Sequence, residues 1–224
     1  MIMSAKFNKN GIVFCTPIDG FDEVSIMKND IVIGENLVNN SVDFVNWSKS
    51  SEWVSYIDDD GFTVCHFERT GATSNNWVRL IPTLKIDPEN YPNGITVSLD
   101  IKTPDVSAIN HKCIGAVQTY QASGSRVGWS EPSWNLSNII NNQWTRVSYT
   151  FSQSSLKINH TSGTTVSYSQ FSFQLVQNGS IDIKKIKIED GTNPTPWCAN
   201  PLDGFGDTPD TCKNPIQAKD FIEL

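Results

Sequence analysis

The sequence of 224 residues predicts an all-β fold, an antiparallel β-sandwich with short framing segments at both ends. Apolar and polar residues alternate along most of the stretch from about residue 40 to 190, as in half-buried strands. Gly, Pro, Asn and Asp separate the alternating runs at hairpin-like spacing, which accommodates eight or nine strands in two packed sheets. No strand pattern alternates with a helical one and no helix longer than two turns is predicted, which disfavours a parallel α/β sheet.

The clearest predicted strand covers residues 95–102, where four apolar residues alternate with polar ones and share one face. Six other runs carry the same pattern, at 62–69, 78–86, 114–121, 144–151, 170–177 and 181–188. Pro82 lacks an N–H group, so it predicts an edge or a break in its run. Lys184 and Lys185 interrupt the apolar alternation of the last run, which predicts a β-bulge there.

Three parts are expected along the chain. Residues 1–34 form an N-terminal framing and docking segment, residues 35–198 form the sandwich, and residues 199–224 form a C-terminal framing segment. Cys15–Asp22 and Cys198–Gly206 resemble each other. The similarity indicates two related docking segments in a larger assembly, or two ordinary Pro/Gly turns that match by chance.

Charge and cysteine content limit the possible partners. The formal net charge is -7, so the sequence lacks the basic footprint of a nucleic-acid-binding protein. No long apolar run predicts a membrane span, and the first residues lack the apolar core of a secretory signal, which favours a reducing cytoplasm. The five cysteines form no CxxC pair, so we expect mostly free, buried thiols, with a Cys198–Cys212 bridge left open.

Several segments resemble family-four-type carbohydrate-binding modules. Glu35–Ser41, followed by Phe44 and Trp47, is similar to their opening strand with its Asn-Leu-x-x-Asn run. Three further segments resemble, in order, their late strand, their closing strand and the exit motif of such modules in phage tail proteins: Asn142–Phe151, Ile181–Glu189 and Gly191–Trp197. The resemblance covers roughly residues 34–203 and implies a jelly-roll sandwich.

The resemblance also implies a function and a location. It implies a non-catalytic module in the tail tip or baseplate of a bacteriophage of a Gram-positive host, made in the host cytoplasm and carried on the virion. The module would bind host cell-wall polysaccharide and other tail or baseplate subunits as a homo-oligomer, with no nucleic acid or membrane as partner. Two alternatives stay open: a structural adaptor without glycan binding, and an accessory domain that degrades polysaccharide.

Members of this family often hold a structural calcium ion through an acidic residue in the closing strand. Lys184 or Lys185 occupies that place here. An ammonium group has no lone pair for a hard cation, which binds oxygen ligands. Asp182 or Glu189 could take over only with a shifted register, so the sequence does not support a calcium site, although a structural calcium stays open; no other cofactor or metal is predicted.

Sugar binding needs flat apolar rings for pyranose faces and planar polar groups for hydroxyls. The sequence has seven Trp, of which Trp47, Trp144 and Trp197 are expected to pack structurally. Loop aromatics and outward polar strand positions are the candidates for a site on a sheet face or on the loop rim. The predicted carbohydrate-binding residues are Trp77, Arg79, Asp100, Gln118, Tyr120, Trp129, Trp134 and Gln174.

No catalytic residue is predicted. Asp58–Gly61 is the densest carboxylate cluster, and its position before a strand predicts a hairpin turn. His66 follows Cys65 within a strand pattern, so the two side chains point to opposite faces and cannot form a nucleophile pair. Serines lack the G-x-S-x-G context of an activated nucleophile. We therefore expect a binding protein and not an enzyme.

Overall fold

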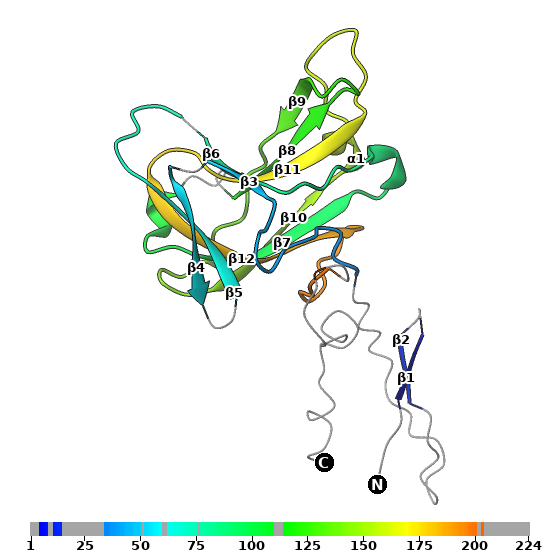
Figure 1. Ribbon diagram of the computed structural model, residues 1–224, viewed down its shortest axis with the longest axis horizontal. Helices are drawn as coiled ribbons and strands as arrows, with labels where there is room; N and C mark the ends of the chain where they lie inside the picture. Colours follow the sequence, from blue (N-terminus) through cyan, green and yellow to red (C-terminus); the bar gives the residue numbers. More distant parts are fainter. Residues whose placement is uncertain are drawn as a thin grey trace, which may run out of the picture.

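The computed structural model describes residues 34–50, 52–59, 62–75, 77–109, 114–200 and 203, and the backbone of residues 5–8 and 11–14. Two five-stranded antiparallel sheets pack into a sandwich of the jelly-roll type, as the sequence predicts (Figure 1). The first sheet has the order β10 (Thr145–Phe151), β7 (Ile95–Lys102), β12 (Gly179–Asp190), β5 (Phe62–Arg69) and β4 (Val54–Asp59). The second has the order β3 (Ser48–Lys49), β6 (Val78–Ile81), β11 (Tyr168–Leu175), β8 (Gly115–Tyr120) and β9 (Arg126–Ser130).

Helical structure is sparse in the described part of the chain. It consists of the short helix α1 (Gln153–Leu156) and two 3-10 turns, η1 (Pro88–Asn90) and η2 (Val106–Ala108). β1 (Ala5–Asn8) and β2 (Gly11–Phe14) form a separate antiparallel pair. None of the described helices is long and apolar enough to cross a membrane.

Seven strands of the sandwich match predicted runs, and three were missed. β3 has two residues, β4 has an irregular burial pattern, and β9 contains Gly128, so none of the three carries clear alternation. β6 ends at Ile81, directly before Pro82, which confirms the predicted break. β12 changes its register against β7 between Lys184 and Lys187, which confirms the predicted bulge.

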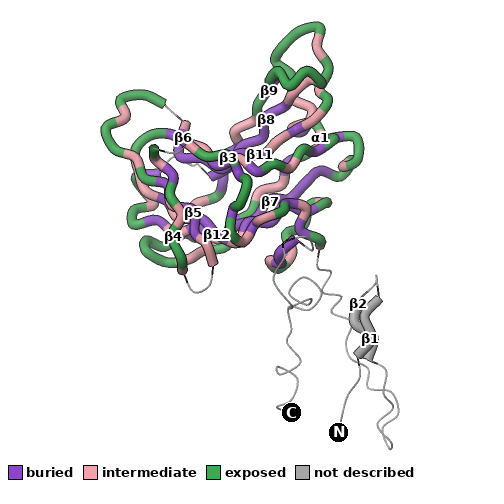
Figure 2. Tube along the Cα trace, in the orientation of Figure 1, coloured by how far each residue is buried: buried purple, intermediate pink, exposed green. Residues whose placement is uncertain are grey.

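The core lies between the two sheets and holds the inward residues of every long strand (Figure 2). Leu99 of β7 and Phe171 of β11 are among its fully buried members. Thr96 and Ser98 are also fully buried, although the alternation predicts them outward. Thr96 donates to the Gly191 carbonyl and Ser98 accepts from Arg146, so polar partners cover the outer side of β7 as well.

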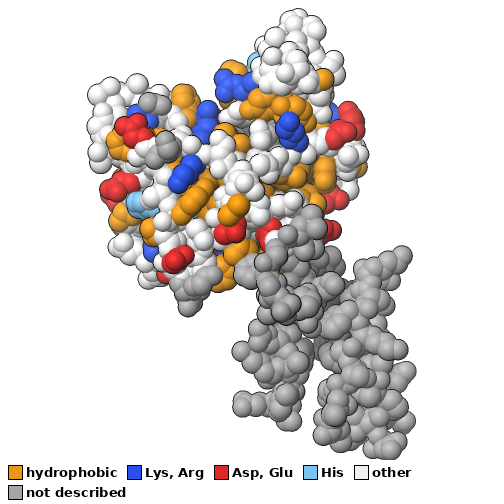
Figure 3. Space-filling model, viewed as in Figure 1, with side chains coloured by type: hydrophobic (Ala, Val, Ile, Leu, Met, Phe, Trp, Pro, Cys, Tyr) orange, Lys and Arg blue, Asp and Glu red, His pale blue; other side chains and the backbone are white. Residues whose placement is uncertain are grey.

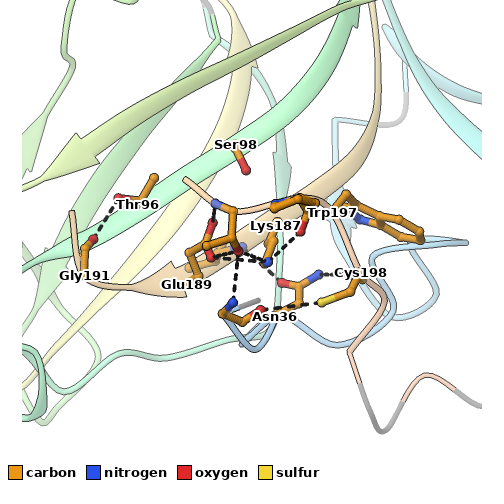
Figure 4. A network of polar contacts seen from close by, with 12 residues as sticks. Asn36, Thr96, Ser98, Lys187, Glu189, Gly191, Trp197 and Cys198 are labelled. Carbon is orange, nitrogen blue, oxygen red and sulfur yellow. Dashed lines mark hydrogen bonds and ion pairs between the residues drawn. The ribbon is translucent and has the colours of Figure 1, made fainter. Parts of the chain in front are cut away.

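The described chain enters and leaves the sandwich at the same place. The Asn36 side chain donates to the carbonyls of Ile186 and Cys198 and accepts from the Ile188 N–H group (Figure 4). The Asn200 amide donates to the Asn36 carbonyl at 2.6 Å. This network fastens the start of the module to β12 of the first sheet.

Two residues assigned to the C-terminal framing segment also contact this end of the sandwich. Asn200 is buried, and the Asp203 carboxylate accepts from the N–H groups of Asn40 and Ser41. Cys65 and Cys198 are buried. The other three cysteines, and with them the possible Cys198–Cys212 bridge, lie outside the described residues, as do the whole of the first similar end segment and five of the nine residues of the second.

Candidate functional site

The outer face of the second sheet gathers aromatic and polar side chains. Antiparallel pairing sets Arg79 opposite Gln174, and it aligns Gln118 with both Gln170 and Trp129. Because side chains alternate along each strand, these residues point away from the core. We call this surface the aromatic face and define it by Trp77, Arg79, Gln118, Tyr120, Arg126, Trp129, Glu131, Tyr168, Gln170 and Gln174.

Three aromatic rings of this face keep access to solvent. Trp129 on β9 is 46 % exposed, and its ring meets His160 edge-on at 4.6 Å. Tyr120 on β8 lies parallel to Tyr168 on β11, with 5.0 Å between ring centroids and 9° between planes. Both tyrosines are partly exposed. The three rings therefore offer flat apolar surface across three neighbouring strands.

The glutamines beneath the rings are buried and already hydrogen-bonded. Gln118 is 6 % exposed and accepts from the Tyr120 hydroxyl at 2.7 Å. Gln174 is 1 % exposed; it accepts from Arg79 Nε at 3.4 Å and donates to Glu131 at 3.3 Å. Sequence reasoning assigned both amides to direct sugar contact. Their burial instead makes them positioning residues that orient Tyr120, Arg79 and Glu131.

Burial changes the electrostatics of two residues on this face. It raises the pKa of Tyr120, whose hydroxyl therefore stays protonated and able to donate at neutral pH. Burial also lowers the pKa of Arg79, and the positive charge of Arg126 acts in the same direction. The two guanidinium groups are thus close enough to repel each other.

The space-filling view shows the surroundings of this face. Lys and Arg side chains lie next to a band of hydrophobic side chains below the hairpin that β8 and β9 form (Figure 3). Cations and rings also make specific contacts here. The Arg126 guanidinium lies 5.4 Å from the Trp129 ring centroid, and the Arg79 guanidinium lies 5.7 Å from that of Trp77. Such contacts hold the cations beside the rings.

Two predicted site residues do not belong to this face. Trp134 is only 3 % exposed, and its indole N–H donates to the Gly115 carbonyl at 3.0 Å, so its ring packs in the core and cannot stack on a sugar. Asp100 lies on β7 of the first sheet, where it pairs with Arg146 at 3.1 Å. The assignment of Trp134 to the carbohydrate site is therefore wrong, and that of Asp100 stays a prediction apart from the aromatic face.

The outer face of the first sheet is a network of paired charges. Lys184 Nζ lies 2.5 Å from Asp59 Oδ2, which also accepts from the Trp144 indole. These bonds, that of Lys184 above all, lower the pKa of Asp59. Asp182 lies 2.6 Å from His66 and 3.4 Å from Lys102. These ion pairs and hydrogen bonds cover much of the outer face of the first sheet.

Nothing among the described residues forms a nucleophile or a metal centre. Cys65 is buried and desolvation raises its pKa well above the usual range, while His66 points to the other side of β5. Within the described ranges no three His, Cys, Asp or Glu side chains are grouped to hold a metal ion. A cavity of about 440 Å³ between β5, β12 and the turn after β7 contains no aromatic lining residue.

A buried ion pair occupies the end of the closing strand. Lys187 is fully buried; its ammonium lies 3.2 Å from Glu189 and donates to Thr195 Oγ1 and to the Pro196 carbonyl (Figure 4). Glu189 also accepts from the Thr195 N–H group at 2.9 Å. The oxygens of Glu189, Thr195 and Pro196 thus neutralise and hydrogen-bond the Lys187 ammonium group.

Comparison with known proteins gives similarity of fold alone. No protein-family model matches the sequence, and no curated protein matches it either. Among solved structures, the family 11 carbohydrate-binding module CtCBM11 is 15% identical over 72% of this chain and 98% of its own, with a TM-score of 0.46. The CBM22-1 xylan-binding domain of Paenibacillus barcinonensis Xyn10C is 12% identical over 72% and 97%, with a TM-score of 0.43.

A phage structure is also similar. The tripod from the baseplate of bacteriophage Tuc2009 is 18% identical over 75% of this chain and 59% of its own, with a TM-score of 0.40. The similar structures are thus carbohydrate-binding modules and a phage baseplate protein. The more specific resemblance to family-four-type modules stays a prediction.

Four members of the aromatic face were missed in the sequence. Gln170 and Tyr168 share the strand face of Gln174, so period-two counting back from Gln174 could have found both. Arg126 could not be placed, because β9 carries a register irregularity against β8. Glu131 lies just after β9, in a segment without a strand pattern.

Proposed function

We propose that this protein is a non-catalytic carbohydrate-binding module and that the aromatic face is its binding site. The observation that carries the proposal is the set of partly exposed rings of Trp129, Tyr120 and Tyr168 on one sheet face, beside Arg79 and Glu131. Rings supply flat surface for pyranose faces, and the charged groups can exchange hydrogen bonds with hydroxyls.

The attachment of the module agrees with this use. The chain enters and leaves on β12 of the first sheet, through Asn36 and Cys198. The aromatic face belongs to the other sheet, so linkage to a larger protein would leave it accessible. Hydrolysis of a glycosidic bond ordinarily uses two carboxylates. Among the described residues of the aromatic face, Glu131 is the carboxylate, which favours binding without cleavage.

We further propose that the glycan is a host cell-wall saccharide and that the protein belongs to a phage tail or baseplate. This step rests on the exit motif Gly191–Trp197, which resembles that of tail-borne modules, and on the order of the other segments that resemble family-four-type modules. A single stacked ring that hides roughly 100 Å² contributes about 2.5 kcal/mol at ~25 cal/mol/Å². Association costs at least ~4 kcal/mol, so individual sites are weak and many copies on one virion would act together.

The test is a binding assay on the full chain. Purified Gram-positive cell walls and an oligosaccharide array are the probes, and Trp129→Ala/Tyr120→Ala is the site variant. Trp144→Ala removes an aromatic ring from the opposite sheet and is the matched control. We expect the wild type and the control to bind, and the site variant to lose binding while its circular dichroism is unchanged.

A structural adaptor makes the opposite prediction. In that case the aromatic face would be covered by a neighbouring subunit, and no wall fraction or oligosaccharide would bind to any variant. Solvent protection of Trp129, measured by fluorescence quenching in the free chain and in the assembled particle, separates the two functions. Release of reducing sugars from the wall would contradict a non-catalytic module.

A further inference from the structure

The cations of the two outer sheet faces differ in their partners. On the first sheet, Lys102, Lys184 and Arg146 each lie within 3.4 Å of a carboxylate, while Lys185 lies over the Phe62 ring. On the second sheet, no ion pair joins Arg79 or Arg126 to any described residue. This contrast occurs in a chain with a net charge of -7, in which carboxylates outnumber cations.

Lys85 extends the unpaired charge along the same face. Its ammonium lies 4.7 Å from the ring centroid of Tyr168, whose ring stacks on Tyr120. Lys85 forms no ion pair within the described part of the chain either. Glu131 is the carboxylate whose charge reaches Arg79 and partly compensates it; one Glu131 oxygen accepts from the Gln174 amide. Three cations therefore face one carboxylate around the rings.

The two arginines contact other groups of this face but form no ion pair with a described residue. Arg79 is half-buried, and its Nε donates to Gln174, a residue that is itself fully buried. Arg126 is held over the Trp129 ring. Burial and the charge of Arg126 both disfavour the charged form of Arg79, which lowers its pKa. An arginine nevertheless stays protonated at physiological pH, so this electrostatic cost is relieved when an anion binds.

We propose that the aromatic face binds an anionic saccharide, with a carboxylate or phosphate of the ligand at Arg79 and Arg126 and a sugar ring on Trp129 or Tyr120. This inference rests on the proposed function and names its substrate class. Guanidinium groups match both anions because their planar N–H fork donates two parallel hydrogen bonds to paired oxygens. A neutral glycan would cover the rings but leave the charges of Arg79 and Arg126 unpaired.

Two matched pairs of polymers test whether binding needs an anionic group on the glycan and whether that group is a carboxylate or a phosphate. Polygalacturonate and its methyl ester differ in the carboxylate; phosphomannan and the same polymer after enzymatic dephosphorylation differ in the phosphate. Affinity electrophoresis of the full chain measures binding at 50 and 200 mM NaCl. We expect one charged polymer to bind at least tenfold more tightly than its neutral partner, with a marked loss at the higher salt concentration.

Two variants of equal net charge then test whether Arg79 and Arg126 are the cations that bind the charged polymer. Arg79→Gln/Arg126→Gln should weaken binding of the charged polymer at least tenfold more than it weakens binding of the neutral partner. Lys102→Gln/Lys157→Gln removes the same net charge elsewhere and should behave like the wild type. The comparison of charged and neutral polymers needs only the wild type, so it stands even if the arginine variant does not fold.

The outcomes separate the two proposals. If neither charged polymer binds more tightly than its neutral partner, although at least one polymer or wall fraction binds, the inference of an anionic ligand is overturned and the carbohydrate-binding function stands. If the control variant loses as much as the arginine variant, general charge and not this face attracts the ligand, and the inference is again wrong. Failure of the wild type to bind any polymer or wall fraction overturns the proposed function and the inference together.

Discussion

The phenol ring of Tyr120 lies parallel to that of Tyr168, with 5.0 Å between the two ring centroids. The Tyr120 hydroxyl is fixed at the same time by its bond to the buried amide of Gln118. A ring that is held from one side and at its tip has lost most of its rotamer freedom before a ligand arrives. Such preorganisation reduces the entropic cost of binding.

If the bond to Gln118 fixes Tyr120, removing either partner of that bond should weaken glycan binding. Gln118→Leu keeps the volume of the side chain but removes the acceptor of the Tyr120 hydroxyl, while Tyr120→Phe removes the donor. If Gln118 acts by positioning Tyr120, the two single variants and the double variant should weaken glycan binding by similar amounts. Titration calorimetry of the four proteins measures this; additive losses would show that Gln118 contacts the ligand independently.

We expect Trp129 to contribute more to glycan binding than any other single residue, because it is the most exposed ring of the aromatic face. Hiding roughly 100 Å² of its surface contributes about 2.5 kcal/mol. Trp129→Ala should therefore reduce affinity about tenfold or more. The measurement is the Kd for the tightest wall fraction, with Trp144→Ala as control. Equal losses in both variants would contradict a site on the second sheet.

Unlike substitutions of Trp129, we expect substitutions of Trp134 to change the stability of the protein and not its glycan binding. Trp134→Ala removes a buried ring and should lower the free energy of unfolding by about 3–5 kcal/mol. Trp134→Phe keeps most of the packing and loses the bond to the Gly115 carbonyl, for a cost of about 1 kcal/mol. Urea unfolding measures both values. Unchanged glycan affinity of the folded Phe variant checks that this ring is no part of the site.

Period-two alternation explains why much of the fold could be predicted. It placed Leu99, Phe171 and their neighbours in the core, because a strand with one buried face must alternate. It also brought Trp77, directly before β6, to the same side as Arg79 of that strand. The sheet order was not accessible in this way, because pairing partners are chosen by contacts between residues far apart in the sequence.

The limits of prediction appear at single residues. Trp134 and Trp129 both lie in turn-rich sequence, yet one is buried and the other is exposed. Trp134 packs closely against Gly115, which has no side chain to block the indole, and this contact between two separate segments cannot be read from the local sequence. Asp100 has the outward parity that was predicted, but parity alone does not say which of the two sheets carries the strand.

We expect substitutions of Lys187 and Glu189 in the closing strand to have strongly coupled effects on stability. Lys187→Met leaves the buried Glu189 carboxylate without its cation, and Glu189→Gln leaves the ammonium without its anion. Each single variant should cost about 3–5 kcal/mol of stability. The double variant should recover part of that loss, because no uncompensated buried charge remains. Urea unfolding of the four proteins measures the coupling, and additive losses would show that the pair is not coupled.

We expect protonation of Asp59 on the first sheet to lower the stability of the protein at acid pH. The hydrogen bond from Lys184, with a further one from Trp144, holds the pKa of Asp59 below its usual value of 3.8. A carboxylate with a lowered folded-state pKa stabilises the fold above the unfolded value and loses that contribution as pH falls through the folded value. The wild-type Tm should therefore fall between about pH 4 and the lower folded-state pKa.

The matched comparison is Asp59→Asn against Asp58→Asn, its exposed neighbour on β4. Asp59→Asn should lower the Tm at pH 7, because Lys184 is nearly buried and loses its partner. Below pH 4 its Tm should fall less steeply than that of the wild type, because the group that titrates is gone. Asp58→Asn should follow the wild-type curve throughout. Identical acid slopes in the wild type and Asp59→Asn would assign the acid sensitivity to other carboxylates.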